Sequence, residues 1–160
     1  MMEFHQIEPV YDENSKILIL GSFPSVRSRQ TGFFDGHPQN RFWKTVAAVY
    51  NDDVPETIRE KKEMLLRNGI ALWDVVASCE IDGSADSSIR NVKVNDIKKL
   101  IGETRISRIY VNGRTAMKYY RKYLEEQLNR KAVLLPSTSP ANAAYSLDRL
   151  VEEWWVIQES

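Results

Sequence analysis

The stretch that decides the fold is KILILGSFPSVRSRQTGFFDGHPQNRFWK, residues 16–44. It begins with a short apolar run, Ile17–Leu20, which has the leucine and β-branched composition of a buried strand and stops at Gly21. It ends where apolar residues start to recur at helical spacing, at Phe42. A strand that leads through a loop into a helix is the repeating unit of an α/β protein.

The same alternation continues along the chain. Further strands are predicted at 70–76, 106–111 and 132–135, and helices at 42–50, 55–68, 96–102, 114–128 and from 147 onward. Two segments are expected to lack regular structure, the lead-in 1–15 and the polar loop 77–91. Parallel neighbours need crossover connections. The sequence therefore predicts an α/β three-layer sandwich with a central, mainly parallel four-stranded sheet and helices on both faces.

Composition narrows the class of protein. The 160 residues suit a single domain, 1–160, with 42% hydrophobic and 28% charged residues and no apolar run of membrane-spanning length. The first residues lack the apolar region of a signal peptide, and Cys79 is the one cysteine, so we expect a reducing, cytoplasmic location. Because the formal net charge is zero, any contact with nucleic acid must come from a local patch.

The loop after the first strand is the leading candidate for a functional site. Connections in compact α/β domains usually take a handful of residues, and this one takes about twenty. Its aromatic, carboxamide and cationic side chains suit a planar heterocycle attached to a phosphate chain. A structural loop pinned by its prolines and aromatics is an equally good interpretation of length and composition alone. The loops after all four predicted strands are polar and should meet at one edge of the sheet, where ligands of such folds bind.

Several other site types are disfavoured. Neither GxGxxG nor GxxxxGK[ST] is present, so we expect no nucleotide cofactor. His5, His37 and Cys79 have no ligand-like spacing, so we expect no metal site. The chain also lacks the GxSxG motif of a serine nucleophile.

Two motifs resemble the uracil-DNA glycosylase superfamily. The first joins GSFPS (21–25) to TGFFDGHPQNRFWK (31–44), and the second is LPSTSPAN (135–142). Within that superfamily they are most similar to the hypoxanthine, or deoxyinosine, DNA glycosylase family, and the resemblance extends over nearly the whole chain. Mismatch-specific relatives place a water-positioning asparagine in the first motif, where this chain has Phe23. That departure favours hypoxanthine over uracil as the substrate.

The resemblance assigns roles residue by residue. Asn40 corresponds to the catalytic asparagine of the hypoxanthine family and is expected to orient water through its carboxamide oxygen, with Asp35 as a second candidate for base or charge stabiliser. The implied base-binding residues are Gly21, Ser22, Phe23, Pro24, Ser25, Phe33, Phe34, His37 and Asn112, of which Phe23 and one of Phe33 or Phe34 would stack on the base. The implied DNA contacts are Arg27, Ser28, Arg41, Lys44, Ser88, Ser137, Thr138, Ser139, Pro140, Ala141 and Asn142.

The implied activity is that of a monomeric, cofactor-free, monofunctional DNA glycosylase that removes hypoxanthine and leaves an abasic site. The implied partner is DNA that contains deaminated bases. Two alternatives stay open: a glycosylase for uracil or xanthine, and a non-catalytic module that binds damaged bases. The second motif offers no bulky apolar wedge, which favours poorly paired or single-stranded targets because unstacking them costs less.

Overall fold

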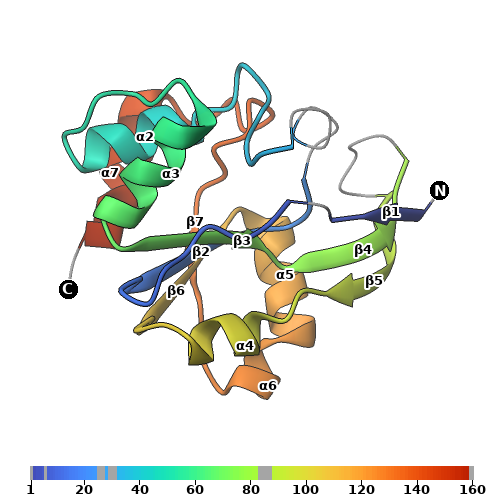
Figure 1. The fold of residues 1–160 in the computed structure, drawn as a ribbon. Coiled ribbons are helices and arrows are strands. Elements are labelled where there is room, and N and C mark those ends of the chain that lie inside the picture. The colour runs from blue at the N-terminus through green and yellow to red at the C-terminus, as the bar shows by residue number, and fades with distance from the viewer. Residues whose placement is uncertain (1, 6, 25–27, 29–31, 83–87, 159–160) are drawn as a thin grey trace.

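A parallel sheet lies at the centre of the protein. The computed structural model describes residues 2–5, 7–24, 28, 32–82 and 88–158. Within them the central strands follow the spatial order β3-β2-β6-β7 (Figure 1). Their bounds are β2 Ile17–Gly21, β3 Ile70–Asp74, β6 Arg108–Asn112 and β7 Val133–Leu135, and every neighbouring pair is parallel. The predicted four-stranded parallel sheet is confirmed.

Helices cover both faces of this sheet (Figure 1). Strand β2 shows why, because its four leading residues are all buried and alternate between two cores. Ile17 and Ile19 pack with one set of helices, α2 Phe42–Val49, α3 Ile58–Arg67 and α7 Leu147–Trp154. Leu18 and Leu20 pack with the other set, α4 Ile97–Gly102 and α5 Arg114–Tyr123. The three-layer arrangement is therefore as predicted.

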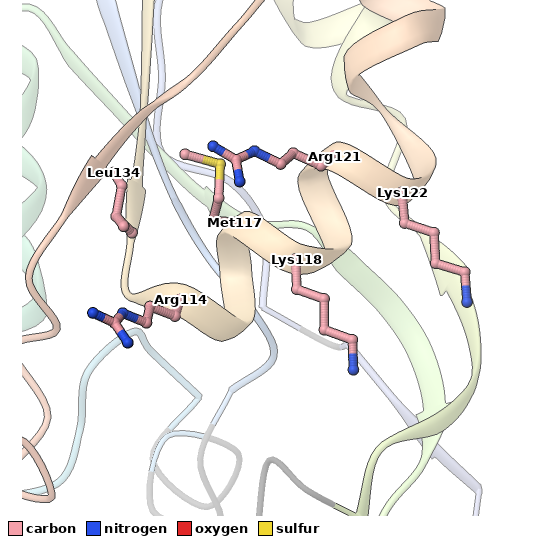
Figure 2. Close-up of a pocket in the computed structure, with 6 residues that line it drawn as sticks. All are labelled: Arg114, Met117, Lys118, Arg121, Lys122 and Leu134. Atoms are coloured by element: carbon pink, nitrogen blue, oxygen red, sulfur yellow. The ribbon is translucent and has the colours of Figure 1, made fainter.

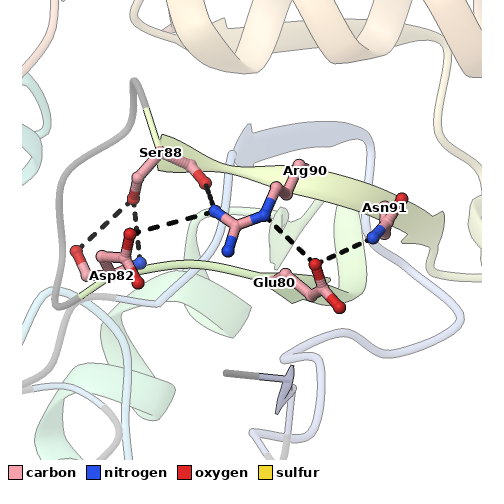
Figure 3. A network of polar contacts seen from close by, with 5 residues as sticks. All are labelled: Glu80, Asp82, Ser88, Arg90 and Asn91. Carbon is pink, nitrogen blue, oxygen red and sulfur yellow. Dashed lines mark hydrogen bonds and ion pairs between the residues drawn. The ribbon is translucent and has the colours of Figure 1, made fainter.

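A second, antiparallel sheet was not predicted. It has the order β1-β4-β5, with bounds β1 Met2–Phe4, β4 Val76–Glu80 and β5 Arg90–Val94. The expected irregular lead-in and the expected polar loop at 77–91 are both wrong in these parts. Figure 3 shows what holds the hairpin, since Arg90 Nε lies 3.1 Å from Glu80 Oε2, and Asn91 Nδ2 donates to the same oxygen at 2.8 Å. The serine and aspartate residues of 77–91 favoured a loop in the sequence, although part of this segment forms strands in which only some side chains pack against the core.

The helix boundaries follow their caps. Helix α3 begins after Thr57, whose hydroxyl accepts from the Glu60 N–H while the Glu60 side chain returns to the Thr57 N–H. The predicted start at Pro55 is thus wrong. Of Asn95 and Asp96, the two capping candidates for the helix at 96–102, Asp96 is the cap of α4, and its side chain accepts from the Lys99 N–H. The remaining short helices are α6 Glu125–Leu128 and the 3-10 helix η2 Trp155–Gln158. No helix in the described part of the chain is long and apolar enough to cross a membrane.

Candidate active site

The carboxyl ends of three neighbouring strands form the floor of the candidate site. Gly21 at the end of β2 lies opposite Asp74 at the end of β3. On its other side β2 pairs with β6 through Leu20 and Val111, which places Gly21 beside Asn112. Neighbouring strands lie about 4.8 Å apart, so the backbones of Asp74 and Asn112 are about 10 Å apart with a glycine between them.

Gly21 leaves room for a carboxylate that the sequence analysis did not single out. A Cβ atom at Gly21 would overlap the Oδ1 atom of Asp74. The other oxygen, Oδ2, lies 2.9 Å from Nε2 of His5. Because His5 Nδ1 accepts from the backbone N–H of Ile7 at 3.3 Å, Nε2 carries the hydrogen and donates it to Asp74. The signal that could have found Asp74 is a lone acid at the end of an otherwise apolar strand.

Asp35 is the second carboxylate of the site. It is half-buried and has a left-handed backbone, with φ of 50°. Burial raises the pKa of its carboxyl group to about 7; the nearby Asp74 carboxylate raises it further and Lys61 opposes the shift. Near neutral pH, Asp35 therefore exists in both protonation states.

Asn40 is the centre of a hydrogen-bond network that joins the two sequence motifs. Asn112 Nδ2 donates to Thr138 Oγ1 at 3.0 Å, and that hydroxyl lies 3.0 Å from Asn40 Oδ1, to which it donates. The Thr138 N–H returns to Asn112 Oδ1 at 3.1 Å. The predicted meeting of the first and last loops is therefore present, with Asn40, Asn112 and Thr138 in direct contact.

The orientation of the Asn40 amide is fixed by the backbone. Its Oδ1 also accepts from the N–H of Phe42 at 2.9 Å, and a flipped amide would turn its NH₂ group toward this donor. Both lone pairs of Oδ1 are therefore used, and no described residue accepts from Nδ2. The oxygen that we expected to orient water is occupied, so Nδ2 is the atom of Asn40 that remains for a ligand.

Three predicted DNA contacts have internal roles instead. The Arg41 guanidinium donates to the carbonyl oxygens of Ser139 at 2.9 Å, Asn142 at 3.0 Å and Tyr145, so it holds the last loop in place. Ser28 is 1% exposed and its hydroxyl accepts from the Gly36 N–H at 2.8 Å. Thr138 is 0% exposed. These three side chains are engaged in contacts within the protein, and their contact with DNA stays a prediction.

The rest of the last loop is a series of tight turns. The Ser139 N–H donates to Ser137 Oγ at 3.1 Å, and the Ala141 N–H donates to Ser139 Oγ at 3.2 Å. Asn142 Nδ2 closes the loop on the Ser137 carbonyl at 3.0 Å. Ala141 is exposed at the tip next to the half-buried Pro140. The loop is thus closed by its own hydrogen bonds and has a small side chain at its tip.

Two of the three predicted stacking residues are in the core. Phe33 and Phe34 are 4% and 3% exposed, and Phe33 is stacked on Trp43 with ring centroids 5.9 Å apart. Neither offers an open ring face, because the loop folds back onto α2. Phe23 is half-buried and meets His5 edge-on at 6.2 Å, so it remains the candidate for stacking.

The other predicted residues are dispersed around the loop. Ser22 is half-buried beside Gly21, Pro24 is buried, and Lys44 is exposed on α2. His37 is exposed, with Nδ1 accepting from the Gln39 N–H at 3.1 Å. Ser88 bonds to the backbone of Asp82 at the hairpin (Figure 3), and Ser25 and Arg27 lie outside the described residues. Among described residues, no group of three or more His, Cys, Asp and Glu could hold a metal ion.

Comparison with known proteins identifies the family. The family model for the uracil DNA glycosylase superfamily matches residues 8–157. The chain belongs to the uracil DNA glycosylase superfamily. This superfamily assignment covers both motifs and all of the candidate site apart from His5.

Relatives within the superfamily agree with the motifs. A hypoxanthine DNA glycosylase from Methanosarcina acetivorans is 37% identical over 91% of this chain and 91% of its own length. A hypoxanthine DNA glycosylase from Methanosarcina barkeri is 37% identical over 58% of this chain and 59% of its own length. The solution NMR structure of a candidate uracil DNA glycosylase from Methanosarcina acetivorans superimposes with a TM-score of 0.83 at 33% identity and covers 99% of this chain and 98% of its own.

Proposed function

We propose that this protein is a monofunctional DNA glycosylase that hydrolyses the N-glycosidic bond of deoxyinosine and leaves an abasic site. The observation that carries the proposal is the network of Asn40, Thr138 and Asn112, which fixes the Asn40 carboxamide at the sheet edge that also carries Gly21 and Asp74. The hypoxanthine DNA glycosylases among its relatives support the choice of base.

The proposed reaction proceeds through a sugar with oxocarbenium character. Water adds to C1′ and loses a proton, while hypoxanthine leaves with the electron pair of the C1′–N9 bond and takes up a proton. Asn40 Nδ2 donates a hydrogen bond to the water oxygen and so holds it in place; positioning rather than strong basicity does most of the work once the bond has largely broken. The carboxylates of Asp74 and, when ionised, Asp35 stabilise the positive sugar.

In the proposed complex the base leaves the helical stack and enters the site above Gly21. Phe23 stacks on its ring, and the backbone of Ser22 meets its polar edge. The small tip around Ala141 fills the vacated stack only partly, which supports a preference for weakly paired or single-stranded targets.

The proposed enzyme acts as a cytoplasmic monomer and uses water without a metal or cofactor. The residues of the candidate site gather at the carboxyl edge of one sheet. The site loops contain no lysine; Lys61, whose charge acts on Asp35, lies on helix α3, and its pKa is lowered by burial against the opposing effect of Asp35. We therefore expect no strand cleavage after base release.

A base-release assay tests the proposal. Single-turnover reactions would use single-stranded and duplex oligonucleotides that carry one deoxyinosine, deoxyuridine or deoxyxanthosine, followed by alkali to cut abasic sites. We expect deoxyinosine to react fastest, and Asn40→Asp to bind the same DNA without producing alkali-labile sites. Fastest release of uracil would refute the substrate. Retention of deoxyinosine DNA by the wild-type protein without any abasic product would refute catalysis and favour a damaged-base binding module.

A further inference from the structure

A groove outside the candidate site runs along helix α5. Figure 2 shows its lining side chains, and its volume is about 620 Å³. They come from α5 and from the edge strand β7: Arg114, Met117, Lys118, Arg121, Lys122 and Leu134. Met117 and Leu134 form an apolar floor between four cations.

The charge of this groove is not compensated locally. Arg114, Lys118, Arg121 and Lys122 are all exposed, and no carboxylate among the described residues lies within 4.0 Å of any of them. Lys118 Nζ and Lys122 Nζ lie 5.6 Å and 5.2 Å from the ring centroids of Tyr119 and Tyr123. Since the whole chain has zero formal net charge, this local excess of four cations is a distinct feature of its surface.

The groove begins at the candidate site. Arg114 follows Gly113 directly, and a Cβ atom at Gly113 would lie 3.2 Å from the Cβ of Ser137 in the last loop. From Arg114 to Lys122 a helix rises about 12 Å. Because α5 returns across the sheet after β6, the line of cations leads from the site edge toward the opposite end of the strands (Figure 1).

We infer that this groove binds single-stranded DNA on one side of the target nucleotide. The inference rests on the proposed function, which places the target at the adjoining edge. A rise of about 12 Å spans at most three or four phosphates of one strand, because the spacing is about 3.4 Å along the axis of a duplex and larger in an extended single strand. Cations along a groove with an apolar floor suit phosphates together with sugars and bases.

The direction of the groove selects a single strand over a duplex. Double-stranded DNA has a persistence length of about 150 base pairs, so a duplex across the carboxyl edge continues straight past the sheet. A flexible single strand can turn at Arg114 and follow α5. If the groove instead bound an acidic peptide, the affinity of the protein for DNA would not depend on these cations.

Two charge-matched triple variants test the inference. Lys118→Gln/Arg121→Gln/Lys122→Gln removes three cations of the groove. Lys98→Gln/Lys99→Gln/Arg105→Gln removes three exposed cations at α4 and the loop after it, and gives the same net charge. Kd would be measured at several salt concentrations for deoxyinosine oligonucleotides with single-stranded extensions of increasing length on either side.

We expect a single-stranded extension on one particular side of the deoxyinosine to increase the affinity of the wild-type protein, and an extension on the other side to leave the affinity unchanged. The groove variant should lose that gain, at least tenfold, and its salt slope on extended DNA should fall by about two, because each single-strand phosphate contributes about 0.7. The control variant should retain both. Equal behaviour of the two variants would overturn the inference, and so would an equal loss on fully duplex extensions.

The single-turnover rate at saturating enzyme separates this inference from the proposed function. Both triple variants should release hypoxanthine at the wild-type rate, because neither set of cations touches the reacting atoms. If the wild-type protein released no base, the proposed function would be wrong. The affinity measurements would still show whether the groove binds single-stranded DNA.

Discussion

Asn40 uses the two atoms of its amide for different purposes. Oδ1 accepts from the Phe42 N–H and from Thr138 Oγ1, and Nδ2 remains for the ligand. Asn40→Asp keeps an acceptor oxygen for both bonds but removes the amide hydrogens, so we expect near-native stability with a single-turnover rate lower by about two to four orders of magnitude. Denaturant unfolding and deoxyinosine hydrolysis measure the two effects.

Asn40→Ala serves as the comparison. It removes the acceptor as well, so it should share the rate loss and also lower the free energy of unfolding by about 1–2 kcal/mol. Near-wild-type hydrolysis by Asn40→Asp, together with loss of activity in Asp35→Asn, would make the Asp35 carboxylate the group that activates water.

Asp35 predicts a pH dependence of stability. Burial raises the pKa of its carboxyl group in the folded protein to about 7, above the unfolded value of 3.8, so the folded state holds this proton more tightly. Ionisation of Asp35 therefore destabilises the folded protein. This loss of stability is absent below about pH 4, grows as the pH rises, and is complete above about pH 7. Asn tolerates a φ of 50°, so Asp35→Asn should become progressively more stable than the wild type over this window.

The same titration should appear in the reaction rate. If ionised Asp35 stabilises the sugar cation, wild-type hydrolysis rises with a midpoint near pH 7 and this step is missing in Asp35→Asn. A wild-type rate that falls through pH 7 would instead assign Asp35 the role of a proton donor.

At the scale of residues, sequence patterns found side chains but not their partners. Asn40, Asp35 and Thr138 were selected because they lie in motifs, and Asn112 because it follows a predicted strand. Asp74 was missed because it lies inside a run that reads as a buried strand, and its partner His5 is 69 positions away. Contacts of this range depend on strand order, which periodicity does not specify.

The two site loops are joined as elements by Arg41. Arg41→Lys keeps the charge but replaces the planar guanidinium, which reaches the three carbonyl oxygens through both Nη1 and Nη2, by a single ammonium nitrogen that lacks this fork geometry. We expect a lower unfolding temperature and a slower single-turnover reaction, because Thr138 loses its support, with an unchanged salt slope of DNA binding.

Lys44→Gln is the contrasting change, since this exposed side chain remains available to phosphate and its loss should reduce the slope by about one. A slope lowered by Arg41→Gln as much as by Lys44→Gln would restore Arg41 as a phosphate contact.

Helix α3 offers a change confined to stability. Thr57 and Glu60 form a reciprocal cap at its start, and the backbone hydrogen bonds to the Glu60 carboxylate lower its pKa. Thr57→Ala should cost about 1 kcal/mol of unfolding free energy without changing base release. Chemical denaturation measures the cost, and a changed single-turnover rate would show that α3 influences the site.

Element predictions succeeded where one pattern dominated. The parallel strands are short apolar runs between helical segments, and all four were identified with boundary shifts of one or two residues. The hairpin of β4 and β5 was missed because only part of each strand is buried: Ala77 and Glu80 of β4 are only half-buried, and β5 has no fully buried residue. Such strands are defined by their pairing more than by their composition.

At the scale of the whole molecule, sheet topology was the most reliable guide to the candidate site. The rule that parallel strands present their carboxyl ends at one edge brought Gly21, Asn112 and the loop after β7 together as expected. It could not predict that Phe33 and Phe34 would turn into the core, because the path of a long loop is set by packing with distant helices. It also gave no warning of the basic groove, which requires α5 and the edge of β7 to be placed side by side.

The pairing of β2 with β6 has a consequence for the life of the protein on the ribosome. Strand β2 can pair with β6 only after Arg108, the partner of Ile17, has been synthesised. The hydrogen bond from Trp154 Nε1 to the Pro136 carbonyl, 2.9 Å long, supports the last loop and can form only near the end of translation. At about 5–20 residues per second, the nascent chain spends several seconds with β2 unpaired on that side. We therefore expect a chain that ends before Trp154 to be inactive, although it contains every proposed base-binding residue.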